Sequence, residues 1–151
     1  MIITDEKLLR VECVDVLPDE VLSLKEKLEE ELQLSFKLGR PGIDLACPQI
    51  GIAKNMAVVR ISTGTGKFHN VDLVNCRISE TYDQAEFHGE GCLSFPDMTA
   101  TTLRYKEIKV VDNLVEPHEF VATGLLAVCI QHELDHLRGV LLPDLAIKSQ
   151  M

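Results

Sequence analysis

The sequence predicts an α+β protein in which antiparallel β-sheets pack around a central helix, with a second, N-terminal helix covering the core. Three patterns carry this prediction: an amphipathic stretch at residues 18–36, strand-like segments within residues 55–119, and a nearly apolar stretch at residues 124–138. A block of strands flanked by helices, without alternating strand–helix–strand units, is typical of the α+β class.

The first helix is expected at residues 18–36. Pro18 fits the first turn of a helix, and acidic residues directly after it suit the positive end of the helix dipole. Four apolar residues recur at helical spacing with charged residues between them: Val21, Leu24, Leu28 and Leu32. This spacing indicates a surface helix that buries one face against the core.

Residues 55–119 contain four short β-branched segments, NMAVVRIST, HNVDLVN, EIKVVD and HEFVA. Turn residues such as GTGK and DN separate some of them, which favours short strands joined by tight connections. The stretch at residues 124–138 has hardly any polar face, so it is expected to be a helix buried on most sides. No repeat or linker is visible, and a single domain spanning residues 1–151 is expected.

Composition excludes several classes of protein. The net charge is −9 and the sequence pI is near 5.0, whereas a general nucleic-acid binder would carry a basic face. The longest apolar run, GLLAVCI, is too short to span a bilayer, and MIITDEKLLR lacks the pattern of a secretory signal. A cytoplasmic location is therefore expected, and the five irregularly spaced cysteines are expected to be buried thiols or a metal ligand rather than disulfides.

The stretch QHELDHLRG, in the predicted central helix, carries a metal-binding pattern. His132 and His136 lie four residues apart, so they are about 40° apart on one helix face and both imidazoles can reach one ion. Glu133 stands beside that face, where it can act on a water molecule without binding the metal. The pattern predicts a metal-dependent hydrolase with two ligands and a general base on one helix.

A third protein ligand is expected upstream of this helix. Fifteen residues follow His136; the position of the third histidine in metzincin proteases is occupied by Leu142, and the sole acid is Asp144. Cys92, in HGEGCLSFP, is the strongest upstream candidate because a thiolate is a good ligand for zinc or iron. Weaker candidates are the other upstream histidines, His69, His88 and His118.

Three segments together resemble the peptide deformylase family: GIDLACPQIG, EGCLS and QHELDHLRG. They occur in the family's order and at similar spacing, over roughly residues 42–144. The resemblance implies an enzyme that removes the formyl group from N-terminal formylmethionine of newly made polypeptides and releases formate.

The resemblance also assigns roles to residues of this sequence. It implies that Cys92, His132 and His136 hold one divalent metal ion, Fe2+ in cells, which Zn2+, Ni2+ or Co2+ can replace. It implies that Glu133 activates the metal-bound water. The developing oxyanion is expected to be held by the side-chain amide of Gln49 and the backbone N–H of Leu93.

Substrate binding is likewise implied by the resemblance. The substrate backbone is expected to pair in a strand-like way near Ile43 and Gly91, in the motif that begins at Gly42. An apolar slot for the methionine side chain is expected beside the metal, lined by Ile43, Leu125, Val128, Cys129 and the ring of His132.

The sequence departs from the family's pattern in several places, of which two bear on function. The first motif usually reads GxGLAAPQ, and here Asp44 replaces its second glycine and brings bulk and negative charge to the expected mouth of the site. Asp44 is therefore expected to affect substrate preference. The chain also ends soon after the metal helix, as in short phage-type members that lack the C-terminal extension used for ribosome docking.

Arg104 matches an arginine of the family and is expected to pair with Asp135, which the predicted buried helix carries.

The expected partners are nascent formylmethionyl polypeptides, with at most a transient ribosome contact, no nucleic acid and no membrane; a monomer is expected. Two alternatives remain at this point. One is an HExxH metallopeptidase that uses the same helix. The other is a catalytically weak module that, because of Asp44, only binds formylated N-termini.

Overall fold

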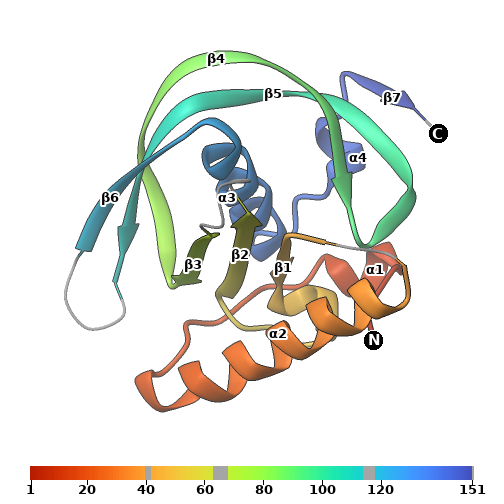
Figure 1. The fold of residues 1–151 in the computed structure, drawn as a ribbon. Helices are drawn as coiled ribbons and strands as arrows, with labels where there is room; N and C mark the ends of the chain where they lie inside the picture. The colour runs from red at the N-terminus through yellow and green to blue at the C-terminus, as the bar shows by residue number, and fades with distance from the viewer. Residues whose placement is uncertain (40–41, 63–67, 114–117, 151) are drawn as a thin grey trace.

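The computed structural model describes residues 1–39, 42–62, 68–113 and 118–150, which form two β-sheets with a helix between them (Figure 1). The helices are α1 (Glu6–Leu9), α2 (Val21–Lys37), α3 (Gly124–Leu137) and α4 (Leu142–Leu145), with 3-10 turns η1 (Pro18–Glu20) and η2 (Cys47–Ile50). The strands are β1 (Asp44–Ala46), β2 (Met56–Ser62), β3 (Phe68–Val74), β4 (Cys76–Cys92), β5 (Phe95–Asp112), β6 (His118–Thr123) and β7 (Lys148–Gln150). These strands pair antiparallel in every described ladder, which confirms the predicted α+β class.

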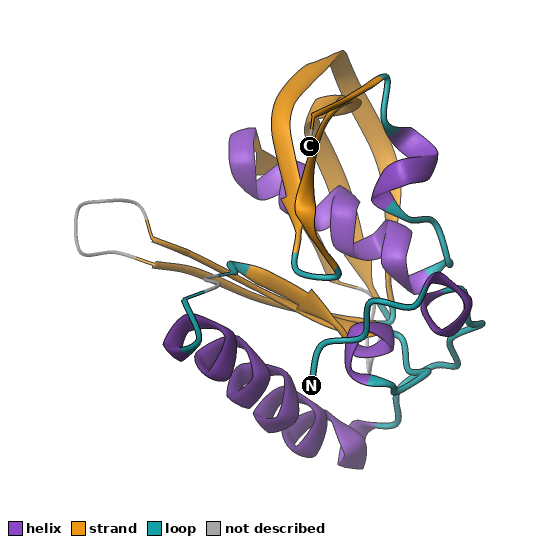
Figure 2. Cartoon of the chain, turned by 90° about the vertical axis from the view of Figure 1, so that its right-hand side faces the viewer, coloured by secondary structure: helices purple, strands orange, loops and turns teal. Residues whose placement is uncertain are grey.

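The first sheet has the strand order β1-β2-β3 and is covered on both faces (Figure 2). Strand alternation sends Ala57 and Val59 of β2 into the core cluster that contains residues of α3. The residues between and before them, Met56 and Val58, enter a second cluster with α2. A strand that is buried on both faces reads as an unbroken apolar run, as MAVV does here.

The N-terminal covering helix is present as predicted, with one local difference. Its first three predicted residues form η1 rather than regular α-helix, and α2 begins at Val21. Short 3-10 turns are common where α-helices begin, and proline tolerates the first turn because it needs no backbone donor there. Leu24, Leu28 and Leu32 are buried against the first sheet, as their spacing predicts.

The second sheet corrects the prediction of short strands throughout residues 55–119. β4 and β5 are 17 and 18 residues long and form one hairpin that arches over α3 (Figure 1). None of the four predicted strand segments lies within β4, where exposed polar residues occupy both faces over much of the strand. Register shifts at Ile78/Glu80, Phe87/Glu90 and Gly91/Cys92 mark bulges that bend the hairpin.

Two further expectations concern chain segments. The predicted GTGK turn, at residues 64–67, lies outside the described residues. Within the described chain, none of the helices is both long enough and apolar enough to cross a membrane.

α3 is the central helix, and it contacts strands of both sheets. It ends one residue earlier than predicted, at Leu137, and Gly139 follows in a left-handed conformation with φ of 74°. Most of its residues from Ala127 onward are buried, including Gln131, His132, Glu133 and His136. Gln131 fixes the helix to β5, because its amide accepts from the backbone N–H of Tyr105 and donates to that residue's carbonyl, at 2.9 and 2.8 Å.

An ion pair ties the N-terminal segment to the chain that follows α3. Arg10 donates two hydrogen bonds of 2.8 Å to the Asp144 carboxylate and a third, of 3.1 Å, to the carbonyl of Gly139. These contacts with Arg10, and then the backbone N–H of Leu141, lower the pKa of Asp144 from 3.8 to about 2.

Replacing Arg10 by glutamine is therefore expected to lower the melting temperature at neutral pH. The Asp144 pKa is depressed in the folded state, so its contribution is present above the unfolded pKa of 3.8 and is lost as the pH falls toward 2. Thermal unfolding of wild type and Arg10→Gln from pH 7 to pH 2 measures this. The difference in melting temperature between wild type and variant should narrow below about pH 4. A difference that stays constant over this range would contradict the stabilising role of the Arg10–Asp144 ion pair.

Candidate active site

Cys92, His132 and His136 converge at one point beneath the β4–β5 hairpin. One ligand atom from each residue lies within 4.8 Å of the others, and Cys92 Sγ is 3.3 Å from His136 Nε2. No other group of three or more cysteine, histidine or acidic side chains in the described chain comes together in this way. The three residues that sequence reasoning combined from separate segments therefore share one site.

Two local structures place these ligands. His132 and His136 are one helical turn apart on α3, with ring centroids 4.9 Å apart. Cys92 ends β4 and pairs with Phe95 across the tight turn formed by Leu93 and Ser94. The site thus joins a rigid helix to the tip of a hairpin.

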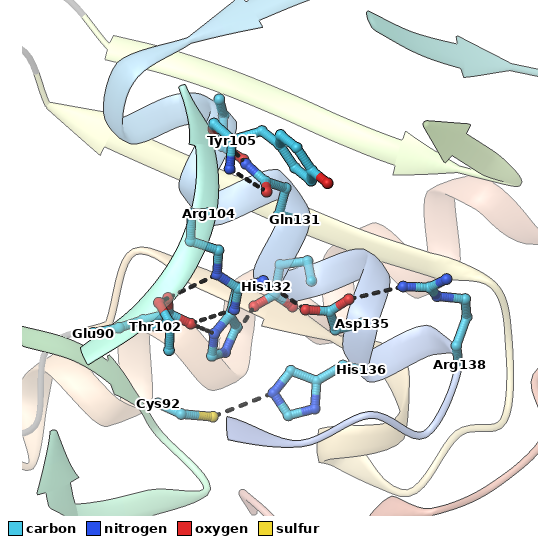
Figure 3. A network of polar contacts seen from close by, with 12 residues as sticks. Glu90, Cys92, Thr102, Arg104, Tyr105, Gln131, His132, Asp135, His136 and Arg138 are labelled. Carbon is cyan, nitrogen blue, oxygen red and sulfur yellow. Dashed lines mark hydrogen bonds and ion pairs between the residues drawn. The ribbon is translucent and has the colours of Figure 1, made fainter. Parts of the chain in front are cut away.

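Glu90 orients His132 from behind (Figure 3). Its carboxylate lies 2.7 Å from Nδ1 of His132, so the Nε2 atom of that ring is left to face the ligand cluster. Thr102 Oγ1 donates to Glu90 at 2.8 Å, and Arg104 donates two hydrogen bonds, at 2.8 and 2.5 Å. A carboxylate that accepts a hydrogen bond from the second ring nitrogen of a ligand histidine fixes the ring's orientation and tautomer.

Charge pairing keeps Glu90 ionised although it is buried. Burial alone would raise the pKa of Glu90, but hydrogen bonds from Arg104 and His132 outweigh it and lower that pKa to about 2. For His132, burial acts to lower the pKa, and the contacts with Cys92 and Glu90 raise it well above its ordinary value.

Arg104 also contacts Asp135, as the sequence predicted. Its Nη1 donates to the Asp135 carboxylate at 2.6 Å, and Arg138 Nη2 donates to the other oxygen at 2.9 Å (Figure 3). Arg104 therefore links Glu90, on β4, to Asp135, on the helix α3 that also carries His132.

Replacing Arg104 by leucine should lower the free energy of unfolding by about 3–5 kcal/mol, because the Glu90 carboxylate would be left buried without its cation. Urea unfolding measures this. Arg138→Leu is the matched control: it also removes a cation from Asp135, but its side chain is 71% exposed, and such pairs contribute about 0–1 kcal/mol. Equal losses in the two variants would contradict a special role for Arg104.

Glu133 is the acid that faces the ligand cluster from α3. It is fully buried, Oε1 lies 3.8 Å from Nε2 of His132, and neither carboxylate oxygen has a hydrogen-bond partner within the described chain. Burial, and then the charge of nearby Asp44, raise the pKa of Glu133 well above its ordinary value. An unsatisfied buried carboxyl is costly to the fold, so its presence points to a ligand.

Gln49 presents its side-chain amide to the same point. Its Oε1 accepts from the backbone N–H of Ala46 at 3.0 Å, which orients the NH2 group toward Ser94 Oγ, at 3.0 Å, and Cys92 Sγ, at 3.5 Å. Leu93 lies in the turn between β4 and β5, outside the strand register, so its N–H is not committed to that ladder. The site therefore offers an amide donor from η2.

Two cavities adjoin the ligand cluster, and the residues expected to bind substrate line them. A small cavity of about 140 Å³ is lined by Ile43, Asp44, Phe87, Gly89, Glu90, Gly91, Leu125, Val128, Cys129 and His132; we call it the slot. An open groove of about 540 Å³ is lined by Gly39, Gly42, Ile43, Asp44, Gly91, Cys92, Leu93, Phe95, Pro96, Met98 and Thr99. Leu125 remains 46% exposed, so it stands at the rim of the slot rather than in its depth.

Sequence reasoning missed the residues that support the ligands, namely Glu90, Thr102 and Ser94. A signal for Glu90 was present: it lies two residues before Cys92 in a segment that follows strand-like sequence, and alternate residues of a strand share a face. No local pattern marks Thr102, because its contact with Glu90 depends on the pairing of β4 with β5.

The donor set suits a divalent metal ion. One thiol and two imidazoles are ligands of zinc and of ferrous iron, and three protein ligands with room for a fourth are typical of catalytic sites. The buried atoms without a partner in the described chain, the Glu133 oxygens and His136 Nδ1, belong to residues of this same site. Burial, and then the charge of His132, lower the pKa of His136 to about 3.

A sequence model described as Polypeptide deformylase matches residues 2–150 of the chain. The chain belongs to the polypeptide deformylase family. Among curated members, the peptide deformylase of Agrobacterium fabrum is 36% identical over 141 residues, which covers 85% of this chain and 83% of that protein. That of Prochlorococcus marinus strain MIT 9515 is 41% identical over 105 residues, 68% of this chain and 52% of that protein. The chain thus spans about half the length of the Prochlorococcus members.

Solved deformylase structures share the fold. A probable peptide deformylase from Synechococcus phage S-SSM7 superposes with a TM-score of 0.83 at 33% identity and covers 96% of this chain and 98% of its own. The Thermotoga maritima enzyme gives a TM-score of 0.80 at 30% identity, over 98% of this chain and 97% of its own. The likeness to phage-type and bacterial members of the family is confirmed.

Proposed function

We propose that the chain is a metal-dependent peptide deformylase: a single cytoplasmic catalytic domain that hydrolyses the N-formyl group of formylmethionine on newly made polypeptides and releases formate. The observation that carries the proposal is the meeting of Cys92, His132 and His136 beside a buried, unpartnered Glu133. Membership of the deformylase family supports the choice of reaction.

Cys92, His132 and His136 would hold one divalent ion, with ferrous iron the proposed ion in cells and zinc, nickel or cobalt able to replace it. Such an ion supplies a water molecule acidic enough to yield the nucleophile near neutral pH, and it polarises the formyl oxygen. Glu90 supports this ligand set by holding His132 in the required orientation.

Glu133 would move the proton of the reaction. Its buried carboxyl, with a raised pKa, would accept a proton from the attacking water and later deliver it to the leaving amine nitrogen. A general base works best when its pKa lies near the working pH, and burial shifts Glu133 in that direction. The absence of a competing hydrogen-bond partner in the described chain leaves both oxygens available.

Gln49 and Leu93 would stabilise the oxyanion that forms at the formyl carbon. The Gln49 amide is already oriented by the backbone N–H of Ala46, with its NH2 group directed at Ser94 Oγ and Cys92 Sγ. A preorganised donor of this kind is typically worth about 10²- to 10³-fold in rate.

The slot would take the methionine side chain, and the groove would take the peptide that follows it. Ile43, Val128 and Cys129 give the slot an apolar wall, which suits an unbranched thioether. Ile43 and Gly91 line both cavities, so an extended substrate could pair with backbone on each side as it leaves the slot.

An anaerobic formate assay tests the proposal. Protein loaded with iron or nickel should release formate from formyl-Met-Ala-Ser, and metal-free protein should not. The peptide products should retain every internal bond. Cleavage of internal bonds without formate would instead indicate a metallopeptidase. Binding of the formylated peptide with neither product would indicate a binding module. Both outcomes would refute the proposed function.

A further inference from the structure

Asp44 faces the catalytic side of the first sheet and lines both cavities. On β1, Ala46 packs in the core cluster that contains residues of α3, while Leu45 packs in the cluster with α2. Asp44 is two residues from Ala46, so its side chain points toward α3 as well. Among the described residues, only Ile43, Asp44 and Gly91 line both the slot and the groove, and Asp44 is the one charged residue of the described groove lining.

No lysine or arginine of the described chain pairs with the Asp44 carboxyl. Its side chain interacts with those of Cys129 and Glu133, with His132 close enough to act through charge, and no ion pair of Asp44 occurs within the described chain. Glu90, by contrast, has Arg104. Burial raises the pKa of the Asp44 carboxyl, and the charge of His132 opposes that rise.

The proposed function, on which the inference rests, locates the substrate's α-nitrogen near this carboxyl. The formyl carbon must lie between Glu133 and the ligand cluster, and the first side chain must lie in the slot. The α-nitrogen is bonded to that carbon and is one carbon removed from the side chain, so it lies between Glu133 and the slot. Asp44 lines the slot and also interacts with Glu133.

We propose that Asp44 binds the α-amino group that deformylation exposes, so that peptides with a free, protonated N-terminal methionine are ligands of this site. Hydrolysis adds water across the C–N bond: the formyl carbon leaves as formate, and the nitrogen gains the proton and becomes an ammonium group. Before the reaction the nitrogen is a neutral amide donor. Afterwards the ammonium group forms a charge-assisted hydrogen bond with the Asp44 carboxylate, and such bonds are shorter and stronger than those between neutral groups.

Calorimetry on the zinc-loaded protein tests this with Met-Ala-Ser and its analogue that lacks only the α-amino group. At pH 6.5 the α-amine is mostly protonated, since its ordinary pKa is about 7.7–8.0, and so does not compete as a metal ligand. The wild type should bind the amine about tenfold or more tightly than the analogue.

Asp44→Asn should bring the two affinities close together, and Asp44→Gly should do the same if the asparagine variant fails to fold. Asp97→Asn is the matched control, because it removes one exposed negative charge from β5 without touching either cavity lining. Equal binding of the two peptides by wild type would overturn the inference. So would an unchanged preference in both Asp44 variants. The formate assay is independent: if it fails while the preference still depends on Asp44, the proposed reaction is wrong and the ammonium site stands.

Discussion

Glu133→Ala is expected to reduce formate release by about 10²- to 10⁴-fold while leaving the bound metal in place. The loss follows from position: Glu133 is the buried acid that faces the ligand cluster, at 3.8 Å from Nε2 of His132, and neither oxygen has a hydrogen-bond partner in the described chain. Because it is absent from the ligand cluster, its removal should not release the ion.

Glu133→Gln sharpens this prediction by keeping the shape of the side chain. An isosteric amide cannot accept the proton, so activity should fall as in the alanine variant. The melting temperature should not fall, because the replaced carboxyl is buried without a hydrogen-bond partner in the described chain. Formate release, metal content by mass spectrometry and thermal unfolding measure the three quantities, with the exposed acid Glu86→Gln as control. Near wild-type activity in either Glu133 variant would exclude it as the base.

Cys92→Ala is expected to weaken metal binding by more than about 100-fold. Even an outer residue that only orients a ligand contributes about 10- to 100-fold to metal affinity, and Cys92 supplies a donor atom itself. The purified variant should therefore contain little metal and release no formate. In cobalt-substituted wild type, a sulfur-to-metal charge-transfer band should be visible, and it should be missing from the variant.

Cys129→Ala is the control for Cys92. Its thiol lines the slot beside the same site but is not one of the clustered ligand atoms, and burial raises its pKa, which keeps it a thiol rather than a thiolate. Metal content should be unchanged in Cys129→Ala. Full metal occupancy in Cys92→Ala, or equal loss in both variants, would remove Cys92 from the proposed ligand set.

Local patterns predicted the helices because their signals lie within the segments themselves. Val21, Leu24, Leu28 and Leu32 repeat at helical spacing, and α2 buries the leucines of that set. The spacing of His132 and His136 on α3 fixed their shared face by helix geometry alone. β4 gave no such signal, since both of its faces are largely exposed and its hairpin partner decides its conformation.

By itself the sequence determined the fold class, the two helices, the pair of histidines and, through three motifs, the family. It did so because periodicity and motif spacing are local properties. Tertiary structure alone decided that Glu90 stands behind His132, that Arg104 contacts Glu90 as well as the predicted Asp135, and that Asp44 faces Glu133. Each of these contacts joins residues at least 31 positions apart, except Arg104 to Glu90, at 14. Such contacts depend on the bend and register of two sheets around one helix, which no single segment of the chain encodes.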